Sequence, residues 1–138
     1  MATPAFEIDL LAPGPPEAVW ERLWDLDRHT AAIPLTTVHG GTLRPGASFT
    51  ARTGVGPVGF DDDMEVVEFD PPRHAVIVKV GRVLHGRIEV DLRPAGPDTR
   101  VRWRQTFGAA GVPDALARYA APAVRAGYLT ALRRLTRP

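Results

Sequence analysis

The sequence predicts an α+β fold with one antiparallel sheet followed by a long C-terminal helix. Two periodicities carry this prediction: apolar residues recur at every second position over residues 6–10 and through most of residues 36–107, and at helical spacing over residues 111–135. The length of 138 residues and the hydrophobic share of 44% indicate one globular domain over residues 1–138. Cysteine is absent, which excludes disulfides, thiolate metal sites and cysteine nucleophiles.

A strand and two short helices are expected first. Apolar and acidic residues alternate over residues 6–10, as in a strand with one exposed face. A proline pair at residues 15–16 suits the first turn of a helix, where the missing amide hydrogen would be unpaired anyway. Asp27 is placed to cap a second helix over residues 28–33, which Pro34 would end.

About six further strands are expected from residue 35 onwards. Glycine and proline turns separate the alternating runs, and the last two runs are joined as in a hairpin. Such alternation predicts an antiparallel sheet with one face in water. A helix is predicted over residues 111–135, in which Pro122 should cause a kink or a restart.

The alternation also predicts which side chains face the interior. Each apolar member of this set fits ordinary core packing as well as a cavity wall. The set comprises Phe49, Phe60, Asp62, Met64, Val66, Val76, Val78, Ile88, Val90, Val101, Trp103, Gln105 and Phe107 from the strands, and Leu116, Tyr119, Ala123 and Tyr128 from the helix.

The polar members of this set suggest chemistry. Asp62 in an apolar cavity would have a raised pKa and could act as an acid or base, although residues 61–63 could also form a solvated strand end. Gln105 could bind a ligand carbonyl or satisfy a neighbouring group. Tyr119 and Tyr128 could each donate a hydroxyl to a ligand or point it into water.

The histidines provide one candidate acid or base and no pattern of metal ligands. His74 has the parity of Val76 and could reach the same interior as a second candidate acid or base. The four histidines lack ligand spacing, and the aspartates of residues 61–63 lack the further spaced oxygens of a calcium loop. We therefore expect no metal and no cofactor.

Arginine dominates the basic residues, since only Lys79 among 17 is a lysine. Arg100, Arg102 and Arg104 share one strand face, with Glu89 and Asp91 as expected cross-strand partners. The same face could alternatively dock a partner. A net charge of +1 gives no general attraction to nucleic acid. The sequence shows neither a bilayer-spanning apolar run nor a basic leader, so we expect a cytoplasmic protein without a membrane span.

Several motifs, taken in order, resemble the START-like superfamily, also called SRPBCC or birch-pollen-allergen-like. More narrowly, they resemble the polyketide cyclase/dehydrase and lipid transport family of small bacterial proteins. The motifs are Phe6–Leu10 with Ala12–Trp20, Asp25–His29, Ile33-Pro34, Glu68–Arg73, Gly86–Leu92 with Asp98–Trp103, and Leu132–Leu135.

This resemblance implies a helix-grip fold, in which a curved sheet of about seven strands wraps the C-terminal helix around a cavity. It implies binding of a polyketide-, lipid- or isoprenoid-like molecule, or alternatively polyketide cyclisation or dehydration, by a monomer or homodimer. The family has no universal catalytic residue, which leaves Asp62 and His74 as candidates from the residues alone. The expected ligand-binding residues are Phe49, Phe60, Asp62, Met64, Val66, Val78, Ile88, Trp103, Gln105, Leu116, Tyr119 and Tyr128.

Overall fold

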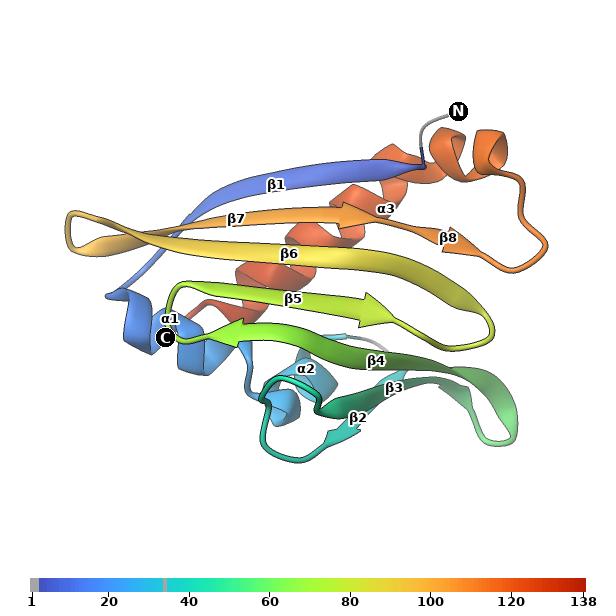
Figure 1. Ribbon diagram of the computed structural model, residues 1–138, viewed down its shortest axis with the longest axis horizontal. Coiled ribbons are helices and arrows are strands. Elements are labelled where there is room, and N and C mark those ends of the chain that lie inside the picture. The colour runs from blue at the N-terminus through green and yellow to red at the C-terminus, as the bar shows by residue number, and fades with distance from the viewer. Residues whose placement is uncertain (1–2, 34) are drawn as a thin grey trace.

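A computed structural model describes residues 3–33 and 35–138 of the chain (Figure 1). The predicted helix end at Pro34 lies outside the described residues. The elements are β1 (Ala5–Ala12), α1 (Pro16–Leu23), α2 (Leu26–Ala32), β2 (Thr36–Gly40), β3 (Ser48–Val55), β4 (Val58–Asp70), β5 (His74–Lys79), β6 (Leu84–Ala95), β7 (Asp98–Thr106), β8 (Gly108–Ala109) and α3 (Asp114–Leu135).

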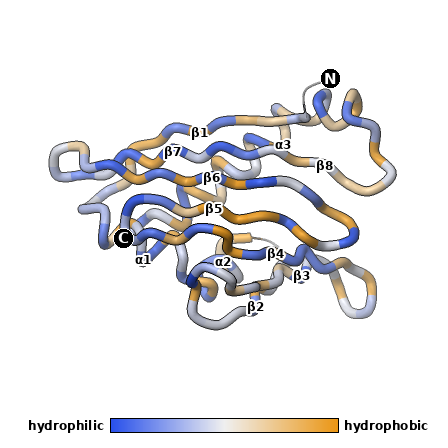
Figure 2. Tube along the Cα trace, viewed as in Figure 1, coloured by the Kyte–Doolittle hydropathy of each residue, from blue (hydrophilic) through white to orange (hydrophobic). Residues whose placement is uncertain are grey.

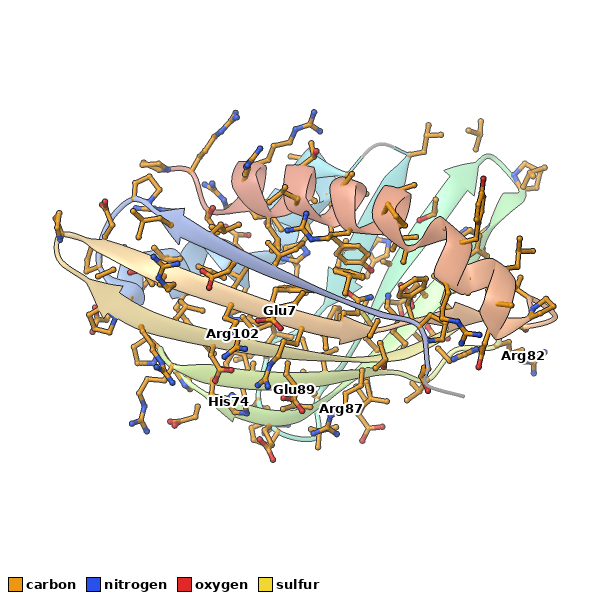
Figure 3. All side chains as sticks on the ribbon, turned by 90° about the horizontal axis from the view of Figure 1, so that it is seen from above. Glu7, His74, Arg82, Arg87, Glu89 and Arg102 are labelled. Atoms are coloured by element: carbon orange, nitrogen blue, oxygen red, sulfur yellow. The ribbon has the colours of Figure 1, made fainter. Side chains whose placement is uncertain are left out.

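All strands belong to one antiparallel sheet, in the order β1-β7-β6-β5-β4-β3-β2, with the short β8 paired to β6. The first strand therefore pairs with the seventh, and β2 forms the opposite edge. Helix α3 lies along one face of this sheet (Figure 3). We call that face the inner face and the opposite one the outer face. The predicted α+β, helix-grip architecture is confirmed.

Local sequence signals explain the two short helices. Pro16 occupies the first turn of α1, as predicted, and α1 buries Val19, Trp20 and Leu23. The cap of α2 is Asp25 instead of the predicted Asp27, and its carboxylate accepts hydrogen bonds from two backbone amides of the first turn.

Helix α3 is fixed at its C-terminal end by arginines. The Arg22 guanidinium donates to the carbonyl of Thr136 at 3.1 Å, and that of Arg28 donates to the carbonyl of Leu135 at 3.1 Å. These contacts place positive charge at the negative end of the helix dipole. Arg134 in turn donates to the Ala32 carbonyl at 3.0 Å. The helix continues through Pro122, so of the two predicted outcomes, a kink or a restart, the restart does not occur.

A β-bulge in β4 closes one end of the interior. The register of β4 against β5 shifts between Val66 and Glu68, which leaves Val67 exposed and turns Phe69 inward. The Phe69 ring then packs against Trp20 and Trp24, with ring centroids 5.1 and 5.9 Å apart. The interior is therefore solid near α1.

Strand β5 departs from simple alternation, because residues 75–78 are all apolar (Figure 2). Register with β4 and β6 sets its faces: Val78 is opposite Glu65 and Arg87, and Val76 is opposite Glu89, so both valines lie on the outer face. Ile77 and Lys79 are on the inner face, opposite Ile88 and Gly86. The predicted inward orientation of Val76 and Val78 is wrong.

The outer face carries a network of ion pairs. Arg100 contacts Asp9 at 2.6 Å and Arg102 contacts Glu7 at 2.6 Å, so β1 supplies partners that the sequence did not predict. Arg104 contacts both Glu89 and Asp91, the expected partners, at 2.9 and 3.3 Å. These contacts agree with the prediction that the arginines of this strand face pair with acidic residues of neighbouring strands. Among the described residues, no helix is long and apolar enough to cross a membrane.

Candidate functional site

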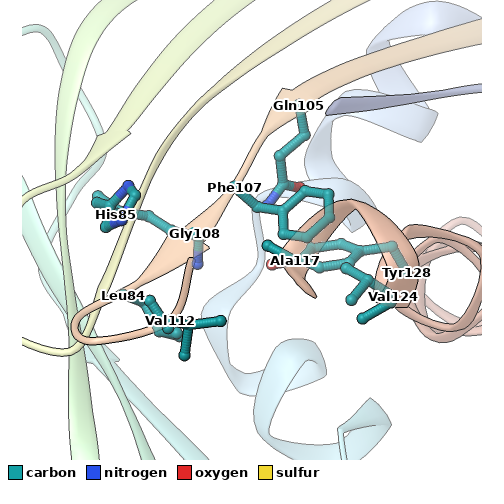
Figure 4. A pocket seen from close by; sticks show the side chains of 12 residues that line it. Leu84, His85, Gln105, Phe107, Gly108, Val112, Ala117, Val124 and Tyr128 are labelled. Atoms are coloured by element: carbon teal, nitrogen blue, oxygen red, sulfur yellow. The ribbon is translucent and has the colours of Figure 1, made fainter. Parts of the chain in front are cut away.

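Three hollows lie between the inner face and α3. The central hollow (about 100 Å³) is lined by β2–β7, by α2 with Trp24 before it, and by the C-terminal half of α3. The end hollow (about 260 Å³) lies between β6–β8 and the N-terminal half of α3 (Figure 4). The side hollow (about 600 Å³) opens between α2–β4 and the middle of α3. Tyr128 lines all three, so the hollows adjoin one another at its side chain, and we refer to the three together as the cavity.

The polar centre of this cavity is an ion pair between Lys79 and Asp62. The Lys79 ammonium donates to Asp62 Oδ2, and the two side chains are only 5% and 10% exposed. Register explains the contact: Lys79 on β5 is opposite Met64 of β4, and Asp62 is the next inner-face residue of β4. Lys79 lines the central and end hollows, while Asp62 lines the central and side hollows.

The lysine of this pair is held in its charged form. Burial alone would lower the pKa of Lys79, but interactions with Tyr128 and with the Asp62 carboxylate outweigh burial and raise it. The ring of Tyr128 is held in turn by Phe6 and Trp103, at centroid distances of 5.3 and 6.0 Å. The cavity thus contains a fixed ammonium, a fixed carboxylate and a phenol.

Two buried polar atoms remain unpaired, and both belong to residues that line the central hollow. Asp62 Oδ1 is buried and has no hydrogen-bond partner among the described residues. The indole nitrogen of Trp24 is likewise buried, without an acceptor in the described part of the chain. Because almost all buried polar atoms in proteins are hydrogen-bonded, both atoms suggest that a further molecule completes this site.

His29, which the sequence did not single out, also lines the central hollow. Its Nε2 lies 2.6 Å from the carbonyl of Leu23, which accepts a hydrogen bond if Nε2 carries the proton. Burial lowers the pKa of His29, while the Leu23 carbonyl and Asp25 oppose this in part. The imidazole is therefore neutral near pH 7.

Gln105 both forms a hydrogen bond within the protein and lines a hollow. Its Oε1 accepts a hydrogen bond from the indole of the buried Trp103 at 3.0 Å, which is the structural role considered from the sequence. The same side chain lines the end hollow beside Phe107 (Figure 4), so Gln105 is also placed where it could contact a ligand.

Most expected ligand-binding residues do lie around the cavity. Val66 is on the inner face but is fully buried in the core and lines none of these hollows. The residues that line at least one hollow are Phe49, Phe60, Asp62, Met64, Ile88, Trp103, Gln105 and Tyr128.

Three other placements differ from the prediction. Val78 lies on the outer face for the register reason given above. Leu116 and Tyr119 are 58% and 86% exposed, because α3 turns Ala117 and Val124 towards the sheet instead. The predicted cavity-facing orientation of these three residues is therefore wrong.

His74 is also misplaced by the prediction. It lies on the outer face, between Asp91 at 2.8 Å and Glu68 at 2.9 Å. Its hydrogen bond to Asp91 raises its pKa; partial burial opposes this, and Glu68 adds to it. Since the sheet separates it from the cavity, it is not an acid or base there.

Lys79, like His29, lines the cavity but was not predicted from the sequence. It sits at the end of an apolar run, where a charged residue normally marks the exposed end of a strand. One feature of the sequence could have pointed to Lys79: it is the single lysine among 17 lysine and arginine residues. A lysine ammonium is compact and a guanidinium is a broad fork, so the two are not interchangeable in a small cavity.

This geometry defines a class of protein: a helix-grip domain with a largely apolar cavity and a buried polar centre. The sequence model of the family described as polyketide cyclase/dehydrase and lipid transport matches residues 6–137, and the chain belongs to this family. The resemblance to this family that the sequence motifs predicted is confirmed. A search of curated proteins found no match.

Solved structures share the fold at low identity. The Zhui aromatase/cyclase from Streptomyces sp. R1128 is 16% identical, with a TM-score of 0.73 over 98% of this chain and 92% of that one. The di-domain ARO/CYC StfQ of the steffimycin biosynthetic pathway is 17% identical, with a TM-score of 0.73 over 96% of this chain and 49% of that one. Ara h 8.0201 is 13% identical, with a TM-score of 0.69 over 97% and 98% of the two chains.

Proposed function

We propose that this protein binds a hydrophobic small molecule, polyketide-, lipid- or isoprenoid-like, between the inner face and α3. The observation that supports this is the set of three hollows that meet at Tyr128. Protein interiors are normally packed as densely as organic crystals, so unfilled space between the sheet and α3 favours a ligand as its occupant. The family description points to the same class of ligand.

Apolar burial would supply most of the affinity. Phe49, Met64 and Ile88 form part of the central wall, and Val124 and Phe107 form part of the end wall. Transfer of apolar ligand surface from water to such walls is favourable and has no preferred direction. Orientation must then come from the few polar groups, of which the Lys79–Asp62 pair is the most deeply placed.

The test is uptake of N-phenyl-1-naphthylamine, whose fluorescence rises in apolar surroundings. Ala131→Phe should weaken dye binding by about tenfold, or ~1.4 kcal/mol, because Ala131 lines the central and side hollows. Ala126→Phe is the matched control, since Ala126 is exposed on the same helix. Absence of uptake by the unmodified protein, or equal loss in both variants, would contradict the proposal.

A second candidate function is cyclisation or dehydration of a polyketide-like substrate in the same cavity. The observation that favours it is the acid and base held together at the cavity centre. Aldol-type ring closure mainly requires a folded substrate in near-attack geometry, which an enclosing cavity would provide. The names of the Zhui and StfQ structures give the analogy but no residue roles.

A linear poly-β-ketone thioester separates the two functions. An enzyme should form cyclic product faster than buffer alone, and Asp62→Leu combined with Lys79→Met should remove that acceleration while dye uptake persists. Dye uptake without acceleration would leave binding as the function. Unchanged turnover in the double variant would exclude the pair as the acid and base.

A further inference from the structure

The polar centre of the cavity lacks one hydrogen-bond donor. Asp62 has two carboxylate oxygens; Oδ2 accepts from Lys79, whereas Oδ1 is unpaired within the described residues. The Asp62 side chain is nine-tenths buried, and it lines both the central and the side hollow. A buried carboxylate oxygen without a donor is costly, so a ligand that supplies one gains more than it would in water.

The charges of the pair restrict what that donor can be. A ligand carboxylate would meet the negative Asp62, and a ligand ammonium would meet the positive Lys79, with little solvent to screen either repulsion. The pair as a whole is neutral, so a neutral polar group avoids both penalties. The fitting group is therefore an uncharged hydrogen-bond donor.

A hydroxyl fits better than an amide N–H. A lysine ammonium has three donor hydrogens; one serves Asp62, and Tyr128 also interacts with the amine. A single ligand oxygen could donate its own hydrogen to Asp62 Oδ1 and accept a remaining hydrogen from Lys79. An amide nitrogen donates but does not accept.

The indole of Trp24 supports a polar ligand end in the same compartment. Its N–H lacks an acceptor within the described ranges, and Trp24 lines the central hollow together with Asp62 and Lys79. One unpaired acceptor and one unpaired donor on residues that line a single hollow suit an oxygen-bearing molecule better than a pure hydrocarbon.

We propose that the cavity selects ligands whose buried end carries a neutral hydroxyl, phenolic or enolic, that donates to Asp62 Oδ1 beside Lys79. This inference rests on the proposed binding function and specifies the ligand chemistry for it. The apolar remainder of such a ligand would extend along the walls towards the end or side hollow.

Three naphthalene probes of similar size test this selection by displacement of N-phenyl-1-naphthylamine. 2-Naphthol offers a hydroxyl donor, 2-methoxynaphthalene lacks it, and 2-naphthoate carries a negative charge. At neutral pH, 2-naphthol should bind about tenfold more tightly than the ether, because a hydrogen bond to a charged acceptor is among the stronger ones. The naphthoate should bind more weakly than 2-naphthol.

The double variant Asp62→Leu with Lys79→Met is the decisive comparison. Removal of one partner strands a buried charge, whereas apolar replacement of both is often tolerated by the fold. In this variant the preference for 2-naphthol over the ether should vanish. Circular dichroism confirms that it folds. Arg100→Met with Asp9→Leu, an outer-face pair, is the matched control and should keep the preference.

The outcomes separate this inference from the binding function. No dye uptake by the unmodified protein overturns the binding function itself. Dye uptake without preference for the hydroxyl overturns the selection and leaves binding intact. A preference that persists in a folded double variant assigns the hydroxyl contact elsewhere and also overturns the inference.

Discussion

The two faces of the sheet differ in how far their ion pairs are exposed to solvent. On the outer face, charged residues of β1, β4, β5, β6 and β7 form several exposed contacts, such as Arg100 with Asp9, whose side chains are 55% and 47% exposed. On the inner face, the described residues form one such pair, Lys79 with Asp62, which is almost entirely buried. Solvent screens the outer contacts and leaves each of them weak. The comparison teaches that burial, and not the number of pairs, decides what a charge does here.

The largest expected effect comes from breaking the inner pair. Lys79→Met should lower the free energy of unfolding by about 3–5 kcal/mol, because it leaves the Asp62 carboxylate buried without its counter-charge. Arg100→Met makes a similar chemical change on the outer face and should cost less than about 1 kcal/mol. Denaturant unfolding at fixed pH measures both. Similar losses in the two variants would refute the contrast.

An intermediate effect concerns His29, whose burial lowers its pKa. The unfolded chain then binds a proton on His29 at a higher pH than the folded chain does. The unfolding free energy should therefore fall as pH drops below the ordinary value of about 6.5, with a slope of at most ~1.4 kcal/mol per pH unit until the lowered pKa is reached. His29→Gln, measured by denaturant unfolding at several pH values, should flatten this slope. An unchanged slope would contradict the assignment.

The smallest effect is expected from His74, whose pKa is raised on the outer face. Its contribution to stability should be fully present below its ordinary pKa of about 6.5 and should disappear as pH rises through the raised value. About a third of its side chain is exposed, so solvent reduces the effect. NMR titration of the imidazole measures the pKa directly, and Asp91→Asn should lower it. A pKa at or below the ordinary value would contradict the contact.

Alternation predicted the sheet well where polar and apolar residues truly alternate. In β7, arginines occupy one face while Val101, Trp103 and Gln105 occupy the other, and the structure has the same faces. In β4 the predicted face of Phe60, Asp62 and Met64 is also the inner one. Each of these strands has one solvent-exposed and one buried face, so polar and apolar residues alternate in the sequence.

Strand β5 was not predictable in this way. Both of its faces are largely covered, so selection for apolar residues acts on both and erases the period. Its faces depend on register with β4 and β6, which is a tertiary property. The misplacement of His74 and Val78, and the oversight of Lys79, all follow from this one strand.

The face of α3 was obscured for a different reason. Alanines occur around much of the helix, and an alanine is compatible with either a buried or an exposed position. The buried stripe of Ala117, Leu132 and Leu135 is therefore only weakly marked, and Leu116 and Tyr119 were natural but wrong choices for its start. The cavity volume itself has no sequence signature, because the same residues can line a hollow or fill a core.

The single lysine gives the molecule a built-in reporter. Lys79 carries the one side-chain amine of the chain, and that amine lies beside the cavity centre. Amine-directed reagents react with the neutral form, which the ion pair suppresses, so modification requires the pair to separate and the cavity to open. The rate of labelling at Lys79, measured by mass spectrometry, therefore reports how often the pair separates and the cavity opens. Protection of Lys79 by a trial compound would report that the compound occupies the cavity, without any knowledge of the natural ligand.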